Sequence, residues 1–395
     1  MSGRANRRAL KRGLAALALG LCASFAAAAE RPPFAPPPKP EPRFLRLLAF
    51  GDYFDPTALA EFETRSGLQI AYDAYGAPSE IAAKLREGHY DLVVLPGPVL
   101  QDEIAAGALQ KIERSRLKNA GAVAPGVAAK LAAYDPSEAY ALPYMWLATG
   151  LLLDQAKVRV RIGARPASWS LIFAPDLARR FADCGIVTPD DRDNMFMAAF
   201  RYMGVSPARL TAVEIKRAGD FLQRLKAGAR AFAAPDVDGA LANGSACVSV
   251  GAEIDARRAM ERAKQSGQPL AIEFVIPPEG GPMSIDAFAI PKDAPHPEEA
   301  YALLDFLLRP DIAARDARAT GLTSGDEGGD REELARLFPE GAVYPALQML
   351  IDQEWTRLKA GEEESAKGKK VNPHIRTVEP RSGAKAKKLS HAPHS

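Results

Sequence analysis

Short apolar runs alternate with amphipathic segments in the first part of this chain, and this alternation constrains the fold more than any other feature. The runs 44–50, 68–75 and 90–95 have the length and residue content of buried strands. The intervening segments 56–66 and 78–88 have helical spacing and are each followed or closed by a glycine. Strands and helices repeating at this spacing predict an α/β fold with parallel strands and helices on both faces of the sheet.

The end of the first predicted strand carries polar groups. The apolar run stops at Phe50, and Asp52 and Tyr53 follow before Asp55 and Pro56, which are suited to start a helix. Open α/β sheets bind ligands outside the carboxyl ends of their strands. The sequence therefore predicts that Asp52 and Tyr53 face a ligand site.

Two later segments are candidates for connections between two lobes. The apolar segment 141–154 is unusually long and fits a strand that leaves one lobe and enters another. The segment 271–291 contains two strand-like runs separated by a Pro/Gly break, as a return crossing would. After the second of these segments, residues 297–317 have clear helical periodicity.

Residues 1–29 have the features of a secretory signal peptide. Five Arg and Lys residues precede the apolar run 13–25 and a stretch of alanines, and we expect cleavage before Glu30. An uncleaved membrane anchor is the alternative, although this apolar run is short for a span. A lipid anchor on Cys22 is disfavoured, because Leu21 precedes it where lipoprotein signals have a small residue. We expect a soluble, periplasmic protein.

The whole chain divides into six predicted segments. They are a signal peptide (1–29), a Pro-rich linker (30–43), the first part of lobe 1 (44–147), lobe 2 (148–284), a return to lobe 1 with C-terminal helices (285–359) and a basic disordered tail (360–395). Both ends are basic, so the part between them is net acidic although the whole chain has a formal charge of +2. An acidic body favours cationic ligands over nucleic acid.

Motifs for covalent chemistry are missing from the sequence. It contains no glycine-rich phosphate loop and no Gly-x-Ser-x-Gly elbow, and none of its five histidines has metal-ligand spacing. Without the signal peptide, the remaining cysteines are Cys184 and Cys247, which we expect to pair in an oxidising compartment; two separate buried thiols are the alternative. We predict no metal, no cofactor and a binding protein rather than an enzyme.

Several stretches resemble the polyamine-binding periplasmic proteins, and the putrescine-binding subtype in particular. Residues 44–355 follow that family in order and spacing, with the matches GDYFDPTALAEFETRSGLQIAYDAY (51–75), YALPYMWLATG (140–150), LANGSACVSVGAEID (241–255), SIDAFAIP (284–291) and AYALLDFLLRPDIAA (300–314). The resemblance implies a type II periplasmic binding protein fold, in which two crossing strands form the hinge between two lobes. It also implies a Cys184–Cys247 disulfide.

The resemblance further implies a ligand site. A polyamine needs carboxylates for its ammonium ends and aromatic walls for its methylene chain. The family positions fall on Phe50, Asp52, Tyr53, Asn194, Asp255, Ser284 and Asp286. Three carboxylates are thus retained.

Part of the aromatic wall is replaced in this chain. Ala252 stands where the family has Trp, and Ser284 stands where it has Phe. Asn194 replaces a family Glu, with Asp193 beside it as a possible substitute. Tyr144 and Trp146 are expected to pack at the crossing.

These features predict the substrate-binding component of an ABC transporter. It would bind a putrescine-like polyamine or a related small cationic amine as a monomer and deliver it to an inner-membrane permease. One alternative is an extracytoplasmic receptor or scaffold that has lost the transport ligand, which the missing rings favour. Another is an enzyme built on the same fold.

Overall fold

The computed structural model describes residues 43–163, 166–206, 209–327, 331–341 and 345–368. The predicted signal peptide, the linker up to residue 42 and the chain after residue 368 lie outside the described residues. The described strands form one continuous sheet in the order β2-β1-β3-β9-β4-β7-β5-β6. In addition, β8 and β10 pair with β4, and β11 pairs with β9.

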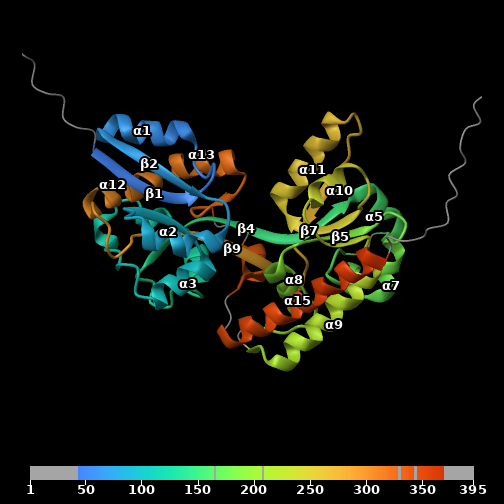
Figure 1. Ribbon diagram of the computed structural model, residues 1–395. Helices are drawn as coiled ribbons and strands as arrows, with labels where there is room; N and C mark the ends of the chain where they lie inside the picture. The colour runs from blue at the N-terminus through green and yellow to red at the C-terminus, as the bar shows by residue number, and fades with distance from the viewer. Residues whose placement is uncertain (1–42, 164–165, 207–208, 328–330, 342–344, 369–395) are drawn as a thin grey trace, which may run out of the picture. The chain divides into compact units, whose positions relative to one another are not determined.

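This sheet has two halves that share the long strand β4 (Ala141–Asp154), as Figure 1 shows. The first half contains β1 (Arg43–Phe50), β2 (Leu68–Tyr75), β3 (Leu92–Pro96), β9 (Gly281–Ala289), β10 (Thr323–Ser324) and β11 (Leu337–Pro339). The second half contains β5 (Ile186–Pro189), β6 (Ala231–Ala234), β7 (Val248–Ala252) and β8 (Ile272–Val275). The predicted crossing 141–154 coincides with β4.

Helices cover both faces of each half. The helices are α1 (Pro56–Ser66), α2 (Ile81–Glu87), α3 (Gly97–Ala105), α4 (Pro125–Leu131), α5 (Gln155–Ile162), α6 (Ser170–Phe173), α7 (Pro175–Ala178), α8 (Arg192–Tyr202), α9 (Ala212–Gly228), α10 (Val237–Ala242), α11 (Glu253–Gln265), α12 (Pro297–Leu307), α13 (Pro310–Thr320), α14 (Arg331–Arg336) and α15 (Pro345–Gly368). In the first half, α1, α12 and α13 share one core with β1, while α2, α3 and α4 share a core on the opposite face. In the second half, α8, α9 and α15 lie on one face and α10 and α11 on the other.

The local sequence explains the first elements. Leu45 and Leu47 of β1 point into one core and Leu48 into the other, as the two-residue period of a strand requires. The Asp55 carboxylate accepts the backbone N–H of Thr57 at 2.7 Å and begins α1 as predicted. The parallel pairing of β1 with β2 and β3 confirms the predicted α/β fold, whereas β9 runs antiparallel to both β3 and β4.

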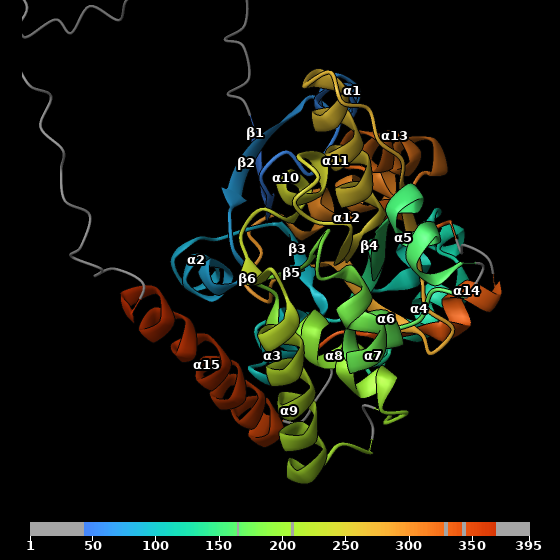
Figure 2. The same cartoon turned by 90° about the vertical axis from the view of Figure 1, so that its right-hand side faces the viewer.

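The last helix packs on the second half of the sheet. Ile351, Trp355 and Leu358 of α15 are buried in the core that also contains α8 and α9, and Figure 2 shows α15 beside α9. Helix α15 continues to Gly368, past residue 360, where the sequence predicts a disordered tail to begin. Within the described residues, no helix combines the length and apolarity needed to cross a bilayer.

The predicted disulfide is present. Cys184 and Cys247 are bonded with their Cα atoms 5.5 Å apart. Each cysteine lies just before a strand, and these strands, β5 and β7, pair in parallel with Ile186 opposite Val248. The strand pairing therefore brings the two sulfur atoms together.

Removing this bridge should destabilise the protein. The bond closes a loop with a sequence separation of 63 residues, for which the chain-entropy model gives about 4 kcal/mol of stabilisation. We expect the Cys184→Ser/Cys247→Ser protein to unfold at a lower urea concentration than the oxidised wild type. Wild type treated with reductant should match the double variant, and identical urea midpoints for all three samples would contradict the prediction.

Candidate functional site

The end of β1 turns sharply and presents polar groups. Asp52 adopts a left-handed conformation with φ of 55°, which Asp tolerates better than most residues. The turn is fixed by the adjacent strand, since Gly51 N–H contacts the Tyr75 carbonyl at 3.4 Å and the Tyr72 hydroxyl donates to the Phe50 carbonyl. The sequence predicts a ligand site at this strand end, and the turn exposes Asp52 while burying the Tyr53 side chain.

A cavity of about 550 Å³ lies at this strand end, and we call it the cleft cavity. It brings together five of the seven predicted site residues, namely Phe50, Asp52, Tyr53, Ser284 and Asp286. The other lining residues are Gly51, Pro78, Pro96, Leu147, Arg258, Ala319, Thr320, Leu322 and Glu340. The lining therefore combines segments far apart in the sequence, from β1, β4, β9, α11 and the end of α13.

Asp286 and Tyr53 form the central polar contact of the cleft cavity. The Tyr53 hydroxyl donates to Asp286 Oδ2 at 2.8 Å. Burial raises the pKa of Asp286 to about 6, although the Tyr53 hydrogen bond opposes this rise. Burial and the nearby Asp286 carboxylate also raise the pKa of Tyr53, so the phenol stays a hydrogen-bond donor. The Phe50 ring lies between two others, 6.2 Å from Tyr53 and 4.3 Å from Tyr75 between centroids.

The remaining two predicted residues line a second cavity of about 310 Å³, which we call the adjoining cavity. Asn194 and Asp255 lie there with Asp191. The two cavities share the lining residues Leu147, Arg258, Thr320 and Leu322. The structure thus separates the predicted set into two neighbouring groups.

Asp255 has a structural task at the start of α11. Its Oδ2 accepts the backbone N–H of Ala252 at 2.8 Å, which satisfies one of the unpaired donors at a helix start. Its Oδ1 lies 3.7 Å from the Arg258 guanidinium. The Asp255 carboxylate therefore already has two partners within the protein, the Ala252 N–H and the Arg258 guanidinium.

Asn194 is held by the residue that starts α8. Asp191 accepts the Asn194 backbone N–H at 3.0 Å and the side-chain N–H at 2.6 Å. The Asn194 side-chain carbonyl is buried and forms no hydrogen bond with another described residue. Asp193, the possible substitute, pairs with Arg192 at 2.8 Å and is not among the described residues that line either cavity.

Sequence reasoning missed three charged residues of these cavities: Asp191, Arg258 and Glu340. An Asp directly before a helical segment is a recognisable start signal, so Asp191 could have been found. Glu340 follows the short strand β11, and no local pattern marks it. Its position depends on the pairing of β11 with β9.

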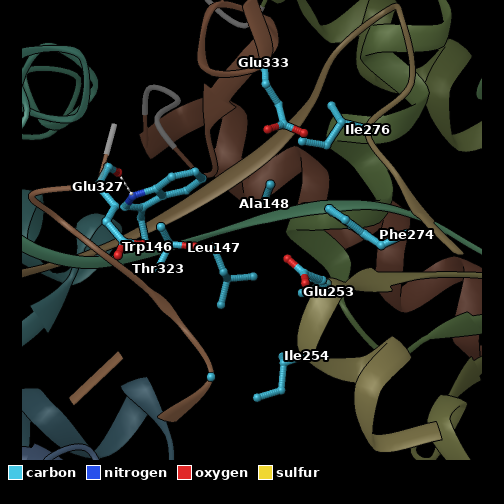
Figure 3. Close-up of a pocket in the computed structure, with 12 residues that line it drawn as sticks. Trp146, Leu147, Ala148, Glu253, Ile254, Phe274, Ile276, Thr323, Glu327 and Glu333 are labelled. Atoms are coloured by element: carbon cyan, nitrogen blue, oxygen red, sulfur yellow. Dashed lines mark hydrogen bonds between the residues drawn. The ribbon is translucent and has the colours of Figure 1, made fainter. Parts of the chain in front are cut away.

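Trp146 lies at a third cavity, of about 200 Å³, shown in Figure 3. Its indole N–H donates to the Glu327 carbonyl at 3.1 Å, and Glu253 and Phe274 lie across the cavity. Tyr144 is buried in the first-half core, where its hydroxyl donates to Asp316. Both residues pack at the crossing as predicted. Among the described residues, no three His, Cys, Asp or Glu side chains are grouped to hold a metal ion.

Comparison with known proteins identifies the family. Residues 57–327 match the family described as bacterial extracellular solute-binding protein. The chain belongs to this family. It is therefore a solute-binding protein and not an enzyme, as the sequence predicted.

Relatives of known function agree with the resemblance. The chain is 30% identical over 337 residues to the putrescine/agmatine-binding protein of Pseudomonas aeruginosa, covering 80% of this chain and 92% of that protein. It is 30% identical over 342 residues to the putrescine-binding periplasmic protein PotF of Escherichia coli, covering 81% and 92%.

Solved structures show the same fold. The spermidine/putrescine ABC transporter substrate-binding protein PotD of Streptococcus pneumoniae matches with a TM-score of 0.69 at 17% identity, covering 80% of this chain and 99% of that one. A PotD lipoprotein of Treponema pallidum matches with a TM-score of 0.67 at 23% identity, with the same coverage. These matches confirm the predicted two-lobed type II fold, with the first and second halves of the sheet in separate lobes.

The raised pKa of Asp286 predicts how the stability of the ligand-free protein depends on pH. Because its pKa rises from 3.8 in the unfolded chain to about 6 in the folded protein, the folded state holds this proton more tightly. The stabilisation is complete below the unfolded pKa and is lost as the pH rises through about 6. The variant Asp286→Asn lacks this titration, so its melting temperature should rise relative to wild type between about pH 4 and 7.

Calorimetry of both proteins across this pH range measures the difference, in which groups that Asp286 does not influence cancel; Glu340, on which Asp286 acts, has a pKa of about 8 and titrates above this range. The exposed Asp102→Asn on α3 serves as the control and should track wild type at every pH. A constant difference between Asp286→Asn and wild type would contradict the prediction.

Proposed function

We propose that this protein is the periplasmic substrate-binding component of an ABC transporter and binds a polyamine or related small cationic amine in the cleft cavity. The observation that carries the proposal is the Asp286 carboxylate, which lines this cavity and accepts a hydrogen bond, among the described residues, only from the Tyr53 hydroxyl. An ammonium group offers the charge and the donors that this carboxylate accepts. Relatives whose names state putrescine binding support the same ligand class.

The charge balance of the cleft cavity supports a cationic ligand. Asp52, Asp286 and Glu340 line it, and none of them forms an ion pair with a Lys or Arg among the described residues. Arg258 is the one cationic side chain in the described lining, and its nearest carboxylate is Asp255. Asp52 is exposed, but Asp286 and Glu340 are desolvated, and desolvated carboxylates are costly unless they are paired. A bound cation would therefore relieve an unfavourable arrangement.

The apolar walls of the cleft cavity suit a methylene chain. On the first-lobe side the Phe50 ring lines the cavity, and Leu147 and Leu322 line it as aliphatic side chains. Ala252, which replaces the family Trp, lines the adjoining cavity and has no ring. A lost cation–π contact costs about 1–2 kcal/mol when desolvated. We therefore propose an affinity weaker than that of a relative with the complete set of rings.

The proposal also covers how the protein takes part in transport. A binding protein of this kind closes its two lobes around the ligand and presents it to a membrane permease. We propose periplasmic delivery through the signal peptide 1–29 and action as a monomer. We also propose the seven predicted residues as the ligand site, with five at the cleft cavity and Asn194 and Asp255 at the adjoining cavity.

Calorimetric titration of the purified protein with putrescine, cadaverine, agmatine and spermidine tests the proposal. We expect one of these amines to bind, and at a hundredfold excess over the dissociation constant to stabilise the protein by about 2.7 kcal/mol. Asp286→Asn should weaken binding at least tenfold, because it removes the charge that pairs with the ammonium group, whereas the exposed Asp102→Asn should not.

A folded protein that binds none of the four amines would overturn the proposal. That result would favour the receptor or scaffold alternative, since Ala252 and Ser284 stand where the resemblance implies rings.

A further inference from the structure

Glu340 lies in the cleft cavity because of a strand pairing that the family resemblance did not include. Strand β11 pairs in parallel with β9, with Pro339 opposite Met283. The Glu340 N–H continues this pairing by donating to the Met283 carbonyl at 3.0 Å, and the Tyr134 hydroxyl donates to the Glu340 carbonyl. Both backbone polar groups of Glu340 are thus paired, which fixes the position of its backbone at the cleft cavity.

The Glu340 side chain lies among acids. The Ser284 hydroxyl donates to its carboxylate, and Asp286 lies on the same strand as Ser284. The charged groups acting on Glu340 are Asp191, Asp193 and Asp286, all negative. Burial, reinforced by these neighbours, raises the pKa of Glu340 to about 8.

The cations on the neighbouring elements have other partners. Lys130 on α4 donates to the Leu337 carbonyl at 2.6 Å, and Arg201 on α8 donates to the Glu279 carbonyl at 2.8 Å. Arg192 on α8 pairs with Asp193 at 2.8 Å and also with Asp352. Arg258 on α11 lines the cleft cavity and lies closest to Asp255. Among the described residues, Glu340 therefore has no cationic partner, although acids approach it from both β9 and α8.

Asn194 provides an independent observation in the same region. Asn194 is 9% exposed and lines the adjoining cavity, which shares four lining residues with the cleft cavity. Its N–H donates to Asp191, so the unpartnered atom is a carbonyl oxygen, an acceptor. An acceptor that lacks a donor and a carboxylate that lacks a cation call for the same chemical group, a charged N–H donor.

We propose that Glu340 is a ligand-binding and specificity-determining residue, whose carboxylate binds a second cationic group of the ligand while Asp286 binds the first. The inference rests on the proposed function and narrows its ligand class. A monovalent amine leaves Glu340 without a cationic partner, so Glu340 stays protonated, whereas a diamine or an aminoguanidine pairs with both Asp286 and Glu340. The cleft therefore selects ligands with two cationic ends over monoamines of the same length.

A proton accompanies this binding. In the free protein Glu340 is largely protonated near pH 7, and a bound cation favours the carboxylate, so binding releases the proton. The affinity for a dication therefore rises as the pH rises from about 6 to 8.

Titration calorimetry with putrescine, agmatine and n-butylamine tests the proposal. Wild type should bind putrescine or agmatine at least tenfold more tightly than butylamine, and at pH 7 it should release protons, measured as a difference in heat between phosphate and Tris buffers. Glu340→Gln should lose at least tenfold in affinity for the dication, little for butylamine, and its proton release. Glu333→Gln, the same change on α14 at the third cavity, should behave as wild type.

The outcomes separate the two proposals. Binding of no amine by wild type would overturn both. Tight dication binding by wild type with unchanged affinity and unchanged proton release in Glu340→Gln would leave the proposed function standing and overturn this inference. Since Glu340→Gln removes a desolvated carboxylate that has no cationic partner among the described residues, it should melt no lower than wild type at pH 8, and a lower melting temperature would show a structural role for the carboxylate instead.

Discussion

The antiparallel pairing of β4 with β9 is the interaction on which the rest of the structure depends. These strands join the two halves of the sheet, and β9 carries Ser284 and Asp286 into the cleft cavity. The register shifts at Tyr144, which has no partner on β9. An extra residue of this kind reverses the faces that follow it. Tyr144 and Met145 therefore both enter one core, and Leu147 opposite Ser284 lines the cleft cavity.

The site combines acids with two different functions. Asp191 and Asp255 use their carboxylates to satisfy backbone N–H groups at the starts of α8 and α11. The Asp286 and Glu340 carboxylates do not accept a backbone N–H at the start of a described helix. They are desolvated, which raises their pKa values. Desolvating a carboxylate without a cation costs stability. Under the proposed function, a bound cation offsets this cost, because it pairs with the desolvated carboxylates.

The two lobes line the cavities with different kinds of side chain, aromatic in the first lobe and aliphatic in the second. The first lobe supplies Phe50 together with Tyr53, and buried rings behind them hold these two in place. The second lobe supplies Val250 and Ile254, which are aliphatic. Aliphatic groups exclude water from a methylene chain but do not attract a cation as a ring face does. Selectivity in this protein is thus expected to depend more on carboxylates than on rings.

The sequence by itself determined the elements and their order. The α/β alternation, the crossing at β4, the start of α1 at Asp55 and the exposed strand end at Asp52 all follow from local periodicity and local hydrogen bonding. Only the tertiary structure decided that Asp286 meets Tyr53 and that Glu340 joins the site. The physical reason is register: these contacts depend on a bulge in β4 and on β11 pairing with β9, and a shift of one residue would turn each side chain to the opposite face.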